Sequence, residues 1–443
     1  MLVVGLAVHN AAMAQLWELG VRGTTLDVAA AWKEVLLLLA LVLAAWKVRR
    51  LPAVLVADAL AAAYAVVVLF YFLLPQDPLG GDATARGELL ALRHHLFPVG
   101  AYALGRLMSS WWRSERLGVV VSITAAGVAL IGLLDLALIS LQAWRDSGVP
   151  GWYREQLGLD YEGLSGLPEN WVYNTGDEQN PIRRLVSTLL SPLASAYVLL
   201  VALLFVAGRG VRWWSVLLGL LLYAGLLYTH TRAAVGALAV GLVVLAIARR
   251  RVAPAVLAFV SLVVAIAFFA AYPRIGPSTS YTGEELEFLR QNAEAEPGAT
   301  TDPFSPAESS LASHWRNLRD GVEAVIEHPQ GYGLGNAGVV AKRTGVEIKA
   351  GESTYVELGI DAGVTGLVAF VLWCIAILRG LWAREAWLVA AFASVLLLGL
   401  QTDVIGVHWL AVALWALAGL ALGAERPHET PPKEPIEAGE QRE

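Results

Sequence analysis

The side chains that could do chemistry in this sequence include three arginines that adjoin long apolar runs. Arg232 stands in a short polar stretch between two such runs, and Arg183 and Arg184 directly precede another. A guanidinium is always charged and presents a planar fork of donors, so arginines at a membrane edge suit a diphosphate anchored in lipid. Long cationic side chains can also snorkel toward lipid headgroups, and one of the adjacent arginines can serve only to position the other.

Glu352 is the second kind of candidate, because it stands just before the apolar run that begins at Thr354. A carboxylate at the mouth of a membrane cavity can take the proton from a sugar hydroxyl as that hydroxyl attacks. The same carboxylate can simply stabilise the start of a helix, where the dipole favours negative charge. The spacing does not distinguish the role of a general base from that of a helix-stabilising carboxylate.

The stretch 307–327 has the spacing of an amphipathic helix. Its apolar residues repeat every three or four positions and are Leu311, Trp315, Leu318, Val322 and Val325. This helix would carry His314, which could exchange protons near neutral pH, although a solvated loop histidine is the commoner case. Arg316 and Arg319 follow on the same helix. Arg316 and Asp320 are spaced as a pair that can simply stabilise it.

The segment 328–335 reads His-Pro-Gln-Gly-Tyr-Gly-Leu-Gly. Pro329 ends the preceding helix, and the alternating glycines permit a tight turn that can approach another segment or a ligand closely. No Gly-Lys-Ser or Gly-Lys-Thr follows, as a Walker loop requires, and no strand precedes, as a dinucleotide fold requires. By its spacing alone, the segment is a turn.

The elements that must position these residues are membrane helices. The chain has 443 residues, of which 57% are hydrophobic and 16% charged, and its mean hydropathy of +0.58 excludes a water-soluble enzyme. A bilayer core about 30 Å thick needs roughly 20 apolar residues per helix. We therefore predict an all-α polytopic membrane protein whose twelve helices lie approximately at 1–17, 27–47, 52–74, 95–112, 117–142, 185–207, 212–229, 232–248, 252–271, 354–378, 385–401 and 404–422.

Basic residues in the short connections predict the orientation. The clusters all follow even-numbered helices and are Lys47 with Arg49 and Arg50, Arg113 with Arg116, Arg209 with Arg212, Arg249 to Arg251, and Arg379 with Arg384. Because such clusters stay in the cytoplasm, both termini are expected there, and the long loops 143–184 and 272–353 are expected on the other side. Positive charge at Arg232 on that side runs against this bias, which favours a binding role over anchoring.

The rest of the composition narrows the function further. A net charge of −6 offers no basic footprint for nucleic acid. The single cysteine, Cys374, lies in an apolar run, so disulfide and thiolate-metal chemistry are not expected. No clustered His, Asp and Cys set suggests a metal site. Four carboxylates and one histidine lie in or near the spans, and most of them are expected to be buried hydrogen-bond partners rather than catalysts; they are Asp58, Asp135, Asp361, Asp403 and His408.

The predicted domain organisation is simple. Residues 1–423 form one membrane domain, whose first segment lacks the basic start and cleavage site of a signal peptide and is read as a retained helix. Residues 424–443, rich in Pro and Glu, cannot bury apolar area and are expected to be a disordered cytoplasmic tail.

The ordered motifs between Arg183 and His408 resemble the O-antigen ligase and polymerase superfamily, the multi-spanning membrane glycosyltransferases that assemble bacterial surface polysaccharide. The motifs are Arg184 with Ser191-Pro192, Thr229-His230-Thr231-Arg232-Ala233-Ala234, His328-Pro329-Gln330-Gly331-Tyr332-Gly333-Leu334-Gly335, and Glu352-Ser353-Thr354-Tyr355-Val356-Glu357-Leu358 before Gly363 and Gly366. Twelve helices with a large structured periplasmic loop between the ninth and the tenth also look like that family and imply a GT-C-like fold.

The resemblance implies an enzyme of the bacterial inner membrane that acts at its periplasmic face. Its donor would be a glycan linked to undecaprenyl diphosphate, and its acceptor a sugar hydroxyl of a second glycan. The transfer would invert the anomeric centre and need no metal, nucleotide sugar or cofactor. Membrane lipid, and in some cases a chain-length regulator, would be its other partners.

Each candidate side chain then receives a role. Arg232, with Arg183 or Arg184, would hold the diphosphate, and Glu352 would be the base, with His314 as the other candidate. Further substrate contacts are expected from His314, Arg316, Arg319 and Tyr355.

One departure from the family bears on the reaction. Lipopolysaccharide ligases place a histidine at the start of His-Asn-x-Tyr-Leu, where this chain has Glu352. Glutamate there looks more like the polymerase branches, so we expect a polymerase. The alternatives are a ligase that joins the glycan to lipid A core, a lipid-linked oligosaccharide flippase, and a structural subunit of an export assembly. No internal repeat is visible, which disfavours a two-halved transporter.

Overall fold

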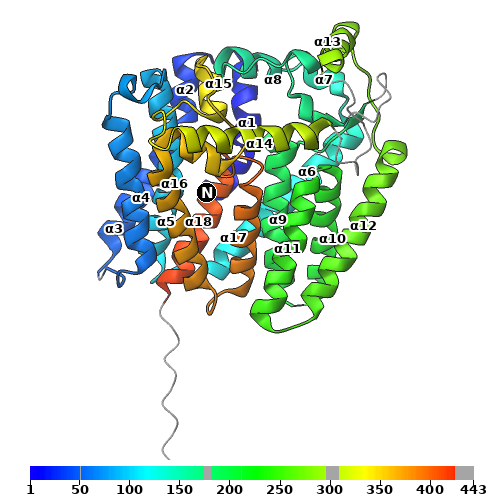
Figure 1. Ribbon diagram of the computed structural model, residues 1–443. Coiled ribbons are helices and arrows are strands. Elements are labelled where there is room, and N and C mark those ends of the chain that lie inside the picture. Colours follow the sequence, from blue (N-terminus) through cyan, green and yellow to red (C-terminus); the bar gives the residue numbers. More distant parts are fainter. Residues whose placement is uncertain (50, 174–180, 211, 296–308, 425–443) are drawn as a thin grey trace, which may run out of the picture.

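The computed structural model describes residues 1–49, 51–173, 181–210, 212–295 and 309–424, and this part of the chain is mostly helical (Figure 1). Its β-structure is one antiparallel pair of two-residue strands, β1 (Val172–Tyr173) and β2 (Ile182–Arg183). The predicted disordered tail lies outside the described residues, except for Ala424.

Every apolar segment expected from the sequence contains a helix. Segment 27–47 is divided into α2 and α3, and the helices concerned are α1 (Leu2–Glu18), α2 (Thr24–Ala30), α3 (Trp32–Lys47), α4 (Val56–Leu73), α5 (Ala85–Met108), α6 (Ser114–Leu138), α9 (Pro192–Gly208), α10 (Trp213–Tyr228), α11 (Arg232–Arg249), α12 (Ala253–Ile275), α16 (Thr354–Leu381), α17 (Ala386–Leu398) and α18 (His408–Gly423). Six described segments are long and apolar enough to cross a membrane, and four helices are apolar but shorter. The protein is thus an all-α membrane protein, while the number of spans stays a prediction.

Two helix starts differ from the prediction because of local capping. α5 begins at Ala85 rather than near residue 95, because Thr84 caps it by accepting a hydrogen bond from the backbone N–H of Gly87 (3.1 Å). α9 begins at Pro192 rather than near residue 185. Proline suits the first helical position, and Ser191 accepts the hydrogen bond of the N-cap.

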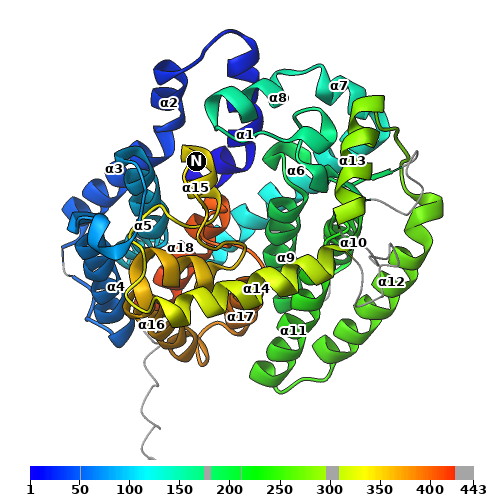
Figure 2. The ribbon, with the colours of Figure 1, turned by 45° about the horizontal axis from the view of Figure 1, so that its top comes forward.

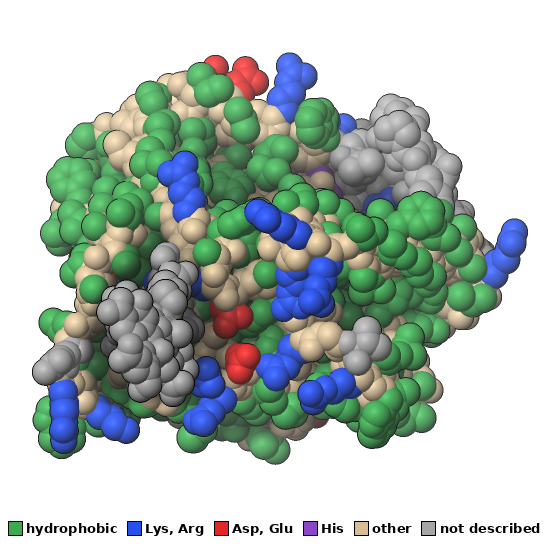
Figure 3. Space-filling view, turned by 90° about the horizontal axis from the view of Figure 1, so that it is seen from below, with side chains coloured by type: hydrophobic (Ala, Val, Ile, Leu, Met, Phe, Trp, Pro, Cys, Tyr) green, Lys and Arg blue, Asp and Glu red, His purple; other side chains and the backbone are tan. Residues whose placement is uncertain are grey.

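One end of the helix bundle is basic (Figure 3). The connections α3–α4, α11–α12 and α16–α17 and the end of α18 lie at the bottom of Figure 1. Seen from below, this face carries many more Lys and Arg side chains than Asp and Glu side chains (Figure 3). The short helices α7 (Leu141–Arg145), α8 (Gly148–Gly151) and α15 (Gly338–Thr344) lie at the opposite end.

Two helices, α13 (Gly283–Ala295) and α14 (Ser309–Glu327), stand between α12 and α15, and α14 runs across the top of the bundle (Figures 1 and 2). The predicted helix is confirmed, but its buried face is rotated from the predicted stripe. Val325 is buried and Leu318 packs against the same cluster, whereas Trp315 and Val322 are exposed. The cause is a close approach at Gly321, where an added Cβ would meet a Val356 methyl group on α16 at 2.6 Å.

The glycine turn 328–335 docks into a break in α16. The helix is interrupted at Ala362 and Gly363, where Gly363 has a φ of 61°. The turn fills this break: the backbone N–H of Val364 donates to Pro329 O (2.9 Å), and that of Tyr332 donates to Ile360 O (2.7 Å). Gly331, at φ +72°, has no room for a side chain, because a Cβ would lie 2.5 Å from the Gly363 nitrogen. The predicted close approach is thus made to another segment of the chain.

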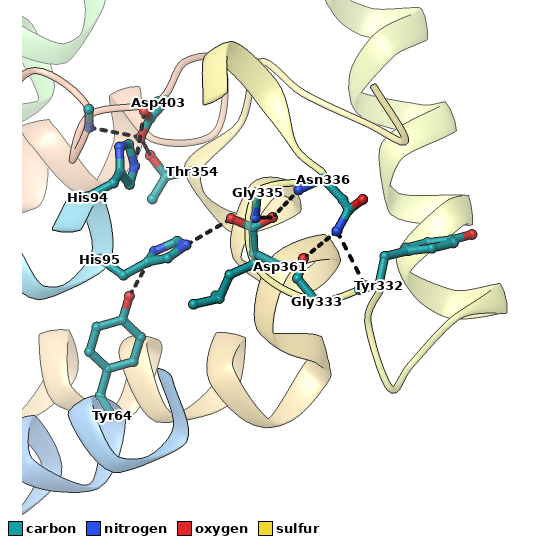
Figure 4. A network of polar contacts seen from close by, with 12 residues as sticks. Tyr64, His94, His95, Tyr332, Gly333, Gly335, Asn336, Thr354, Asp361 and Asp403 are labelled. Carbon is teal, nitrogen blue, oxygen red and sulfur yellow. Dashed lines mark hydrogen bonds and ion pairs between the residues drawn. The ribbon is translucent and has the colours of Figure 1, made fainter. Parts of the chain in front are cut away.

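Buried polar groups lock this turn in place (Figure 4). Asp361 of α16 accepts hydrogen bonds from the backbone N–H groups of Gly335 (3.1 Å) and Asn336 (3.2 Å), and its other oxygen lies 3.0 Å from Nε2 of His95. The hydroxyl of Tyr64 lies 3.2 Å from the second nitrogen of His95. Each of the four carboxylates has a partner: Asp135 pairs with Arg183 and Asp361 with His95 in buried positions, while Asp58, paired with Arg106, and Asp403, paired with His94, are half-buried. His408 is half-buried and stacks on Phe97.

Candidate active site

One cavity of 1410 Å³ lies at the end of the bundle that carries α14 and α15. Segments far apart in sequence contribute to its wall. Its polar and charged lining includes Arg93, His94, Arg184, His230, Arg232, His314, Asn317, Lys342, Arg343, Lys349, Glu352, Glu357, Asp403 and His408. The cavity is larger than the roughly 300–1,000 Å³ usual for a single small ligand. It therefore has room for more than one substrate group.

Arg184 and Arg232 meet at the short turn between α10 and α11. The backbone N–H of Leu185 donates to Tyr228 O (2.9 Å), which ties the strand end to this turn. The guanidinium of Arg184 then donates from Nε to Thr229 O (2.8 Å) and from Nη2 to the hydroxyl of Thr231 (3.2 Å). Arg232 is the first residue of α11 and lines the same cavity. Two guanidinium groups therefore share one wall.

His230, in the same turn, reports the positive potential of this wall. Its ring is buried and stacks on Tyr272 with centroids 4.8 Å apart. Burial, followed by the charges of Arg184 and Arg232, lowers the pKa of His230 to about 3. The imidazole is therefore neutral at physiological pH and adds no charge to the two arginines.

Glu352 and His314 form a hydrogen-bonded pair at the rim of the cavity. Oε2 of Glu352 lies 2.7 Å from Nδ1 of His314, and the two side chains are 47% and 41% exposed. The hydrogen bond with His314 lowers the pKa of Glu352, against a partial burial that raises it, and a further hydrogen bond with Asn317 also lowers it. The carboxylate is thus held ionised and accessible, as a proton acceptor must be.

The helix period explains which residues of α14 reach the cavity. His314, Asn317 and Gly321 line it, because residues three or four apart share one face. Arg316 and Arg319, both predicted to bind substrate, are exposed and do not belong to the lining. They point from other faces of the same helix.

Arg183 and Tyr355 also lie away from the cavity lining. Arg183 is buried, and its Nη2 pairs with Asp135 Oδ2 at 3.1 Å, while Nη1 donates to Ile139 O. Successive residues of an extended segment point to opposite sides, so Arg183 faces the core and Arg184 faces the cavity. The hydroxyl of Tyr355 donates to Leu396 O on α17 (2.8 Å). Arg183 thus ties β2 to the end of α6, and Tyr355 ties α16 to α17.

A cluster of three polar side chains, which the sequence did not reveal as a cluster, lies deeper in the cavity. The ligand atoms of His94, Glu357 and Asp403 lie within 4.8 Å of one another, close enough to hold a metal ion. Asp403 is 3.2 Å from Nε2 of His94 and also accepts a hydrogen bond from the backbone N–H of Gly406 (3.1 Å). These residues come from α5, α16 and the segment before α18, so no sequence spacing could have linked them.

Part of the chain matches a known protein family. Residues 216–371 match the family model described as O-antigen ligase. The resemblance to the O-antigen ligase and polymerase superfamily is thereby confirmed. The O-antigen ligase match covers Arg232, His314 and Glu352, whereas Arg184 lies before it. No curated protein matches the chain.

Proposed function

We propose that this membrane enzyme is a surface-polysaccharide polymerase that transfers a glycan from undecaprenyl diphosphate to a sugar hydroxyl of an acceptor. One observation carries the proposal. Two arginines suited to a diphosphate and a carboxylate suited to a base line the same cavity. The sequence left open whether Arg183 or Arg184 acts with Arg232. We assign this role to Arg184, because Arg183 is paired with Asp135.

The proposed reaction is a direct displacement. The acceptor oxygen attacks the anomeric carbon of the donor and forms the new glycosidic bond, while its proton passes to Glu352. The bond from that carbon to the diphosphate breaks, and its electron pair stays on the phosphate oxygen, held by Arg184 and Arg232. Such stabilisation of the leaving group is commonly the largest single contribution to catalysis. Attack opposite the leaving group inverts the anomeric centre.

The chemistry of the donor supports a reaction that needs no metal ion. A diphosphate is already a good leaving group, and two guanidinium groups can balance its charge. The fold is consistent with a site at the periplasmic face of the inner membrane and with cytoplasmic termini, because the basic connections lie at the end of the bundle away from the cavity (Figures 1 and 3).

A polymerase and a ligase differ in the acceptor that they use. A polymerase incubated with purified lipid-linked repeat units should make a ladder of longer lipid-linked glycans. A ligase should instead attach the glycan only when lipid A core is added. A ladder made without lipid A core supports the polymerase. Strict dependence on lipid A core would contradict it, and movement of the donor across vesicles without any new glycosidic bond would indicate a flippase.

The pH dependence of transfer should report the pair of Glu352 and His314. A base with a lowered pKa stays ionised, and therefore active, until the pH falls through that lowered value. In His314→Gln the pKa of Glu352 should rise, so the acid limb of the rate profile should move to higher pH. Initial rates of chain extension across the acid range measure this shift. A variant that is inactive at every pH would instead make His314 the base.

A further inference from the structure

A second pair of arginines lines the same cavity from other elements. Arg93 stands on α5 and Arg343 on α15. In Figure 1 these helices lie to the left of α11, whose first residue is Arg232 of the first pair. The cavity therefore has cationic groups on two separate walls.

Arg343 is the group whose surroundings most need explanation. Burial, and then the charges of Arg93 and Arg86, lower the pKa of Arg343 to about 10, and the charge of Asp27, the smallest of these effects, raises it. Within the described residues it forms no ion pair, and its side chain donates one hydrogen bond, from Nε to Leu157 O (3.3 Å). A guanidinium has five N–H donors. Keeping a half-buried guanidinium among like charges is costly unless an anion completes the site.

Arg93 is only partly neutralised as well. Its Nη1 lies 3.1 Å from Glu34, but the same carboxylate oxygen is 3.5 Å from Lys33. Its Nε is buried and has no hydrogen-bond partner. One carboxylate thus serves two cations, and Arg93 keeps positive charge and an unused donor beside Arg343.

We propose that Arg343 and Arg93 form a second anion site, which binds the diphosphate of the acceptor. This inference rests on the proposed function, because a polymerase must hold two lipid-linked glycans at once and each carries its own diphosphate. The acceptor attacks through a hydroxyl at the end of its glycan remote from its lipid. The diphosphate of the acceptor must therefore lie away from the diphosphate of the donor. Two arginine pairs on separate walls of the cavity fit this requirement.

Binding of undecaprenyl diphosphate tests the second site without any turnover. The full protein is placed in phosphatidylglycerol nanodiscs, so that bulk anionic lipid competes at constant excess, and bound undecaprenyl diphosphate is counted by native mass spectrometry. We expect two molecules on the wild-type protein. Arg343→Gln should weaken one of them by about tenfold or more, since it removes charge-assisted hydrogen bonds. Arg93→Gln should weaken the same one, and Arg343→Lys should weaken it less.

Control variants and a second lipid separate the possible outcomes. Arg154→Gln, an exposed arginine outside the cavity lining, should still bind two molecules. A single bound molecule that is lost in Arg232→Ala but kept in Arg343→Gln would overturn the second site and leave the proposed function standing. If Arg232→Ala binds undecaprenyl diphosphate as the wild-type protein does, this result would instead count against the proposed function. A second site that fills with lipid A core and not with undecaprenyl diphosphate would also overturn this inference.

Discussion

Glu352→Gln is expected to abolish glycan transfer while leaving the fold intact. Glutamine has nearly the same size and can still hydrogen-bond His314, but its amide cannot take the proton of the acceptor hydroxyl. Loss of a general base commonly lowers the rate by roughly 100- to 10,000-fold. The measurement is the rate of chain extension by the purified protein in vesicles, with thermal unfolding recorded in parallel.

The matched control for this variant is Glu284→Gln. Glu284 is an exposed carboxylate in the first turn of α13, and it does not line the cavity. This variant should transfer glycan at the wild-type rate. Full activity of Glu352→Gln would remove Glu352 as the base. Activity lost in His314→Gln at every pH would then assign that role to the histidine.

Arg232→Ala is expected to lower the transfer rate by about 100-fold or more, because the leaving diphosphate loses one of its two guanidinium partners. Arg232→Lys keeps the charge but loses the planar fork, so its rate should fall between those of the alanine variant and the wild type. Rates are measured at saturating acceptor over a range of donor concentrations, which separates weaker donor binding from slower chemistry.

Arg274→Ala is the control for charge at this end of the bundle. Arg274 is exposed in the last turn of α12 and does not line the cavity. Its removal should leave the rate unchanged. If Arg232→Ala were as active as Arg274→Ala, Arg232 would be a lipid anchor, and the diphosphate site would have to lie elsewhere in the cavity.

The positions of the apolar helices could be predicted from sequence because they depend on a local property. A run of apolar residues long enough for the bilayer forms a helix wherever it occurs, since its backbone polar groups must be satisfied within the segment. The limits of these helices were less predictable. Thr84 extends α5 into a polar stretch, and Pro192 delays the start of α9.

Motifs predicted which side chains could act, but not which of them meet. Arg183 and Arg184 are chemically identical neighbours, and only the pairing of β2 turns one toward Asp135 and the other toward the cavity. On α14, a rotation set by the contact of Gly321 with α16 brings His314 to Glu352 and leaves Arg316 and Arg319 outside.

Composition and local motifs thus lead to an all-α membrane protein of the O-antigen ligase and polymerase type, with Arg232 and Glu352 as its foremost candidates. Only the tertiary packing places these two residues in the wall of one cavity, puts Arg184 rather than Arg183 in that wall, and brings His94, Glu357 and Asp403 together. The physical reason is that an apolar helix depends on residues that are neighbours along the chain, so the local sequence predicts it. A binding site depends on distances between residues that can be hundreds of positions apart.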